Sequence, residues 1–232
     1  MTIEDKIAVL YQIAPEVYGF NDAESFKKLV KTVNAFISTG PALVKLAGLI
    51  ATLEKEQRMQ GAKSAGKGSA LKVAEKILKR APKHCQSLHF ANIIDGNQYI
   101  CDGFICVCYS EGNHLPLEEM PKNLQPMDRL PSFFVDMTGE DVEVPNLKAL
   151  KNYIKMQKSL HKSEKNYRIP FDFGIGNCQF NAQFLAELIE MLPEAKAKIG
   201  KDKLIFKDEQ GNKGLLCGVR PPQGKERKKT EI

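Results

Sequence analysis

Basic side chains recur at helical spacing in two segments of the chain. Around residues 146–163 successive lysines lie three or four positions apart, and residues 71–81 carry three lysines and an arginine opposite an apolar face. This spacing places like charges on one helix face, where each pair repels by about 0.2–0.5 kcal/mol. A polyanion would remove the repulsion, so we predict contacts with duplex DNA through its phosphates, independent of base sequence. The predicted DNA contacts are Lys72, Lys76, Lys79, Arg80, Lys148, Lys151, Lys155 and Lys158.

The composition allows a folded core and is compatible with an acidic partner. The chain has 232 residues, 43% of them hydrophobic, and a formal net charge of +6. Solvated lysines alone produce such a charge, so an ordinary solvated helix face remains the alternative for both basic segments. The N-terminus has no basic start, and the most apolar stretch, residues 42–53, contains Lys45 and is too short to cross a bilayer. We expect a cytoplasmic protein with reduced cysteines and no membrane contact.

Cysteines cluster in one strand-like segment. Cys101, Cys106 and Cys108, with His114 further on, are ligand types that zinc accepts, but no Cys-x-x-Cys pair is present. Cysteines two apart on a strand point to one face, which is also the pattern of buried thiols in a sheet. The sequence has no glycine-rich phosphate loop and no paired catalytic carboxylates. We therefore predict buried thiols, no metal site and no cofactor.

Another cysteine, Cys178, has a more specific sequence context. Residues 176–180, Gly-Asn-Cys-Gln-Phe, resemble the start of the nucleophile helix in ovarian-tumour-type cysteine peptidases. A thiol at a helix N-terminus has a lowered pKa. The resemblance also implies a histidine base downstream of Cys178, and Ile175 stands where the family motif has aspartate. The histidines all lie upstream, at His84, His89, His114 and His161. We predict a non-enzyme without catalytic residues, with a Cys178 hydrolase as the less favoured alternative.

The elements that would position the basic segments follow a repeated order. In the second half we predict a strand over 167–173, a helix capped by Asn181 over 182–192, and three strands over 196–199, 204–207 and 215–219. In the first half we predict a helix over 71–81 and strands over 87–95 and 97–110. Asp95-Gly96-Asn97 between those strands is a strong hairpin signal.

The second half resembles a half-domain of the bacterial DNA polymerase sliding clamp. The resemblance lies in residues 180–188 (Phe-Asn-Ala-Gln-Phe-Leu-Ala-Glu-Leu), Leu192-Pro193, residues 204–206 and residues 214–220. It implies an α+β fold, a DNA-clamp-like domain of two βαβββ-type halves, and a non-enzymatic replication accessory or tether. A chain with room for one such domain would need homo-oligomers to form a ring. Glu187 and Glu190 depart from the family pattern, in which this helix faces DNA.

The remaining segments complete the predicted organisation. Residues 1–60 read as three helices, the third running from Pro41 to about Gln60, and residues 61–69 read as a linker. The clamp-like domain covers 70–221, and the basic tail 222–232 is expected to be disordered. Within the domain we predict a short strand over 132–137 and a helix over 146–163, with Leu147, Leu150, Ile154 and Leu160 facing inward. The alternative function is a protein-interaction module of a phage or mobile element, docking a partner through residues 1–60.

Overall fold

The computed structural model describes residues 41–164, 167–175, 178–219 and 229–231. The chain divides into two compact units, Met1–Gly68 and Ser69–Ile232. In the first unit, the two helices predicted before residue 41 lie outside the described residues. The third is helix α3, Pro41–Ser64. The predicted linker 61–69 is wrong at both ends, because residues 61–64 belong to α3 and residues 68–69 to helix α4, Gly68–Arg80. The helix ends in a Schellman motif, in which Gly66 has a φ of +71° and Lys67 N–H donates to Ala62 O at 2.7 Å.

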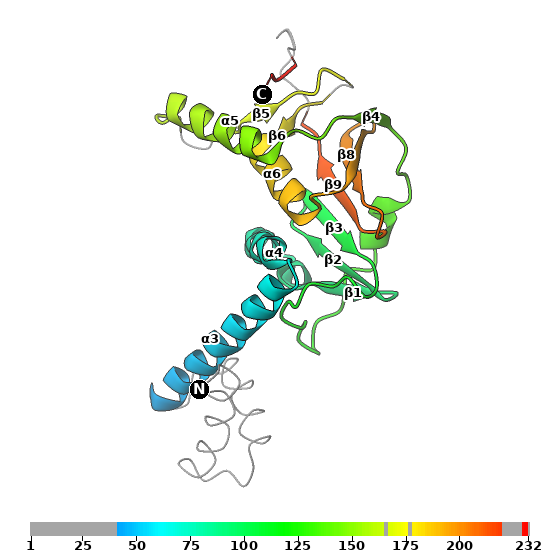
Figure 1. The fold of residues 1–232 in the computed structure, drawn as a ribbon. Coiled ribbons are helices and arrows are strands. Elements are labelled where there is room, and N and C mark those ends of the chain that lie inside the picture. Colours follow the sequence, from blue (N-terminus) through cyan, green and yellow to red (C-terminus); the bar gives the residue numbers. More distant parts are fainter. Residues whose placement is uncertain (1–40, 165–166, 176–177, 220–228, 232) are drawn as a thin grey trace. The chain divides into compact units, whose positions relative to one another are not determined.

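The second unit is built on a seven-stranded sheet in the order β1-β2-β3-β9-β8-β7-β4 (Figure 1). All its neighbouring strands are antiparallel. The predicted α+β class is therefore confirmed. The strands are β1 Asn92–Ile94, β2 Asn97–Cys101, β3 Ile105–Tyr109, β4 Glu140–Val142, β7 Lys196–Ile199, β8 Lys203–Lys207 and β9 Lys213–Cys217.

In the first half of this unit, helix α4 (Gly68–Arg80) leads into β1, β2 and β3. The hairpin predicted at Asp95-Gly96 is confirmed, because both residues have positive φ, 49° and 73°, and join β1 to β2. The predicted strand over 87–95 is wrong in its first part, which is the 3-10 helix η1, Gln86–His89. The predicted strand over 97–110 is instead two strands, since the turn at Gly103, with φ +91°, reverses the chain.

In the second half, helix α6 (Ala182–Met191) leads into β7, β8 and β9. Asn181 caps α6 as predicted, accepting hydrogen bonds from the backbone of Gln183 and Phe184. The strand predicted over 167–173 is only the two residues β5 Pro170–Phe171, which pair with β6 Phe180–Asn181 in a separate sheet. Strand β7 has the predicted bounds, while β8 and β9 begin earlier than predicted, at Lys203 and Lys213.

Two predictions for the intervening segment need correction. Residues 132–137 do not form a strand, because Leu130–Phe134 is the 3-10 helix η2, which buries Leu130 and Phe134. Helix α5, Leu147–Leu160, is capped by Asn146 and buries Leu150 and Ile154 as predicted. Leu160 does not face inward: it is the last residue of α5 and is 69% exposed.

The sheet separates two apolar layers. Figure 1 shows α4, α6 and α5 on one side of the sheet, with η2 on the other. Successive side chains of a strand point to opposite faces of the sheet. Tyr99, Cys106 and Leu215 lie on the face against which Leu130 and Phe134 pack. On the opposite side α6 approaches β9 closely at Gly214, where an added Cβ would lie 2.6 Å from Leu188 Cδ1.

The end of the chain returns to this unit. Thr230 N–H donates to Asp172 O at 2.8 Å, and Asp172 N–H donates to Thr230 Oγ1 at 2.9 Å. The prediction of a disordered tail over 222–232 is therefore wrong for residues 229–231, because these paired hydrogen bonds hold them. The rest of that predicted tail lies outside the described residues.

Candidate functional site

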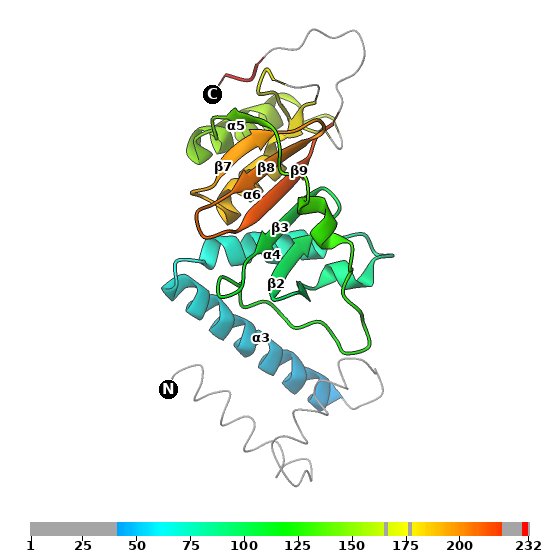
Figure 2. The same cartoon turned by 90° about the vertical axis from the view of Figure 1, so that its right-hand side faces the viewer.

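Helix α6 lies between α4 and α5 in the helix layer, as both ribbon views show (Figures 1 and 2). The two segments with predicted DNA contacts are α4 and α5, so the structure places them on either side of α6. Helix α5 packs along α6, and α4 reaches it through ion pairs. The side chains that join these helices decide which of the predicted basic residues remain available to a ligand.

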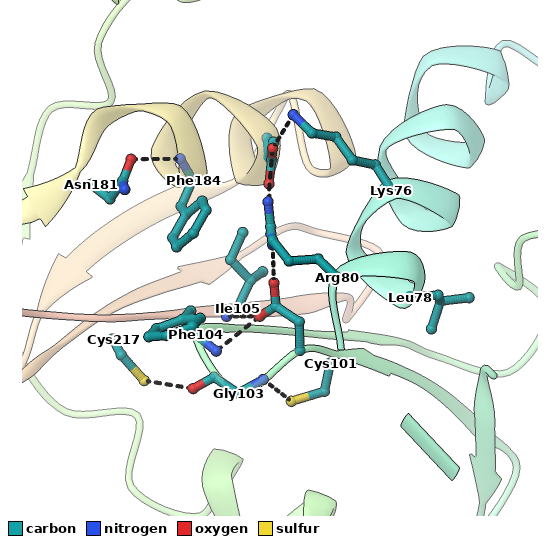
Figure 3. Close-up of polar contacts among 12 residues, drawn as sticks. Lys76, Leu78, Arg80, Cys101, Gly103, Phe104, Ile105, Asn181, Phe184 and Cys217 are labelled. Carbon is teal, nitrogen blue, oxygen red and sulfur yellow. Dashed lines mark hydrogen bonds and ion pairs between the residues drawn. The ribbon is translucent and has the colours of Figure 1, made fainter. Parts of the chain in front are cut away.

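Glu187 of α6 is connected to α4 by ion pairs with Lys76 and Arg80, whose side chains are labelled in Figure 3. Its side chain is only 7% exposed. Lys76 Nζ lies 2.6 Å from Glu187 Oε1, and Arg80 Nη2 donates to Glu187 Oε2 at 2.8 Å. The glutamate that departs from the clamp pattern is thus occupied by two cations of the neighbouring helix.

Arg80 extends the network from the helix layer to the sheet. Its Nε donates to Asp102 Oδ2 at 2.5 Å, and the Asp102 side chain is fully buried. The other oxygen, Asp102 Oδ1, accepts from the backbone N–H groups of Phe104 and Ile105, each at 2.8 Å. Arg80 therefore links α4, α6 and the turn between β2 and β3.

The charge state of Arg80 follows from these neighbours. Burial alone would lower its pKa, but hydrogen bonds and attraction from Glu187 and Asp102 outweigh burial and raise that pKa. The guanidinium carbon also lies 4.2 Å from the centre of the Phe184 ring. Arg80 was predicted to contact DNA, but the structure uses its guanidinium to connect two carboxylates and an aromatic ring.

The second glutamate of α6 faces the other neighbour. Lys151 of α5 forms an ion pair with Glu190. Each of the two helices beside α6 thus neutralises one α6 carboxylate. Glu187 and Glu190 depart from the clamp pattern, but both carboxylates are paired with cations. Helix α6 therefore has no unpaired glutamate in the middle of the helix layer.

The other predicted contacts point to solvent. Within the described ranges, no carboxylate forms an ion pair with any of the five remaining lysines. They are Lys72, Lys79, Lys148, Lys155 and Lys158, and all are exposed. Lys76 stays 62% exposed despite its contact with Glu187. We call these six lysines the basic rim, because they border α6 on both sides.

The candidate thiol of Cys178 is buried beside the chain at Gly218. Cys178 is 1% exposed, and an added Cβ at Gly218 would lie only 2.5 Å from its Sγ, so the chain at Gly218 covers it. The helix capped by Asn181 begins at Ala182. Cys178 therefore precedes the first residue of that helix by four positions.

The strand cysteines are buried as predicted. Cys101, Cys106 and Cys108 are each 4–5% exposed, and burial raises the pKa of Cys108. In the part of the chain that the structure describes, no cluster of three or more histidine, cysteine or acidic side chains could hold a metal ion. In the same part, no helix is both long and apolar enough to span a membrane.

Sequence reasoning missed the carboxylates that orient the basic side chains. Asp102 and Glu187 had local signals: Asp102 precedes a glycine in a turn, and Glu187 interrupts an apolar helix. Neither signal identifies the cation that pairs with it. No protein-family model, curated protein or solved structure shows a significant match to the chain.

Proposed function

We propose that residues 69–232 form a non-enzymatic, clamp-like module that binds duplex DNA through its phosphates. The observation that carries this proposal is the basic rim: lysines of α4 and α5 border α6, whose carboxylates are already paired. Phosphate contacts of this kind release counterions and are insensitive to base sequence. The module would serve as a replication accessory or tether in the cytoplasm.

The order of elements supports the clamp-like part of the proposal. A helix followed by three antiparallel strands occurs twice, as α4-β1-β2-β3 and as α6-β7-β8-β9, and the two sets of strands meet where β3 pairs with β9. The second half has only the short β6 before its helix, and no described strand precedes α4. Since one such module cannot enclose a duplex, ring formation would require several copies of the chain.

A protein-binding module is the second candidate, and one observation favours it. Met156 and Leu160, one helical turn apart on α5, are 52% and 69% exposed. Exposed apolar side chains on one helix face are typical of protein docking surfaces. Binding through these residues would depend little on salt, whereas binding through the basic rim would weaken steeply as salt rises.

A salt titration with charge-reversal variants tests the proposal. Binding of a labelled duplex should be measured from about 20 to 200 mM salt for the wild type and for Lys148→Glu/Lys155→Glu, in which neither lysine has a described ion-pair partner. We expect weaker binding to all sequences and a log–log salt slope smaller by about 0.9 for each phosphate that is no longer neutralised.

The matched control reverses two exposed charges on another segment. Lys122→Glu/Arg129→Glu changes the net charge equally, but both residues lie in the segment before η2 and outside α4 and α5. Equal loss of binding in both variants would mean that only net charge matters. Unchanged binding in the α5 variant, or no binding by the wild type at low salt, would rule out the basic rim as a DNA surface.

A further inference from the structure

The turn between β2 and β3 presents an exposed aromatic ring on a fixed backbone. Phe104 is 45% exposed. Its N–H donates to Asp102 Oδ1 at 2.8 Å, and its carbonyl oxygen accepts from Cys217 N–H at 2.9 Å. Both backbone groups of Phe104 are therefore bonded, one to a buried carboxylate and the other to strand β9. The backbone that carries the ring is thus fixed on both sides, although nearly half of the residue's surface is exposed.

A second ring and a cation support Phe104 from the helix layer (Figure 3). The rings of Phe104 and Phe184 lie 5.6 Å apart, tilted by 36°. The guanidinium of Arg80 lies over Phe184, and the same guanidinium holds Asp102, which bonds the Phe104 backbone. One network of charges thus contacts the Phe184 ring and the backbone of Phe104. An aromatic side chain fixed in advance loses little conformational entropy when a ligand covers it.

Exposed lysines lie on α4, the same helix that places Arg80 over the Phe184 ring. Lys76 belongs to the same network and is 62% exposed, and Lys72 and Lys79 are exposed on the same helix. The nearby carboxylates of Asp102 and Glu187 are buried and paired. Aromatic rings and lysines on one surface form the combination that binds single-stranded nucleic acid, with bases on the rings and phosphates on the cations.

We propose that Phe104 is a stacking platform for an unpaired nucleobase, with the adjoining phosphates held by the lysines of α4. This inference rests on the proposed binding of nucleic-acid phosphates by the lysines of α4, and it extends the ligand from duplex DNA to unpaired bases. Bases inside a duplex are already stacked, so the ring can accept a base only from a single strand, an overhang or a junction. Purely apolar protein docking would use the ring but would not require a base.

The composition of the chain provides a direct probe. The chain has no tryptophan, so Phe104→Trp introduces the sole indole at the proposed platform. We expect a single-stranded oligonucleotide to quench the fluorescence of the Phe104→Trp variant. An abasic oligonucleotide with the same number of phosphates should quench it much less, and so should a blunt duplex. Equal quenching by the intact and abasic strands at saturation would overturn the proposal.

Affinity measurements on the full chain provide the second readout. Phe104→Leu keeps an apolar side chain against Phe184 but removes the aromatic face, and should weaken single-strand binding by about 5- to 150-fold, the effect of removing one stacked base. Duplex binding should be unchanged. The matched control is Phe133→Leu on η2, where the exposed phenylalanine is 40% accessible. Equal single-strand affinity of Phe104→Leu and the wild type would also overturn the proposal.

The two proposals fail in distinguishable ways. If duplex binding depends on the basic rim while single-strand affinity is the same with and without bases, only the stacking platform is refuted. If reversing Lys148 and Lys155 leaves duplex binding unchanged while base-dependent quenching persists, the rim is refuted as a duplex surface. Absence of all nucleic-acid binding at low salt refutes both.

Discussion

Replacing Arg80 by methionine tests whether the charge network holds the helix layer to the sheet. The substitution retains an apolar stem of similar length but removes the cation between Glu187 and Asp102. Asp102 is fully buried and would lose its only described ion-pair partner, whereas Glu187 would keep Lys76. Removing one partner of a buried ion pair typically costs about 3–5 kcal/mol.

The magnitude for this site lies near the lower end of that range. The Arg80 side chain is 26% exposed, so water can compensate part of the loss. At about 2–4 °C per kcal/mol for a chain of this size, a loss of about 3 kcal/mol lowers the melting temperature by roughly 6–12 °C. Asp102→Asn, combined with Arg80→Met, should recover part of the loss, because asparagine retains the acceptor for Phe104 and Ile105 without leaving a buried charge.

Thermal and denaturant unfolding followed by circular dichroism would measure these differences. The matched control is Lys151→Met, which removes the more exposed ion pair with Glu190 and should cost at most about 1 kcal/mol. If Arg80→Met destabilises the protein no more than Lys151→Met does, the Arg80 network does not hold the layer together. If the double variant is less stable than Arg80→Met alone, the burial of an unpaired Asp102 charge is not the cause.

Two further predictions concern the independence of the second unit and the role of its thiol. A fragment covering residues 69–232 should unfold in one cooperative transition without residues 1–68, because it contains the seven-stranded sheet, helices α5 and α6, and all of α4 except its first residue. A molten fragment in calorimetry would contradict this. Cys178→Ala should leave nucleic-acid binding unchanged. A thiol reagent should modify exposed Cys217 before buried Cys178 in the native protein. Faster labelling of Cys178, or a hydrolytic activity that disappears in Cys178→Ala, would favour the enzyme alternative.

The sequence by itself determined the turns, helix starts and helix faces, because each of these depends only on residues that are close together along the chain. Asp95-Gly96 specified a hairpin because these residues tolerate the positive φ that the turn requires. Asn181 specified the start of α6 through its side-chain acceptor. The spacing of the basic residues placed Lys148 and Lys155 on the exposed side of α5, since helical periodicity alone decides which residues share a face.

Contacts between distant segments were decided only by the tertiary structure. The sequence did not show that β3 would pair with β9 in one continuous sheet, or that β4 would extend its edge beside β7. It likewise did not show that Glu187 would neutralise Lys76 and Arg80, or that Asp102 would hold the Phe104 backbone. These outcomes depend on which strands and helices come together in three dimensions, and a charged side chain has no local preference that identifies a partner far along the chain.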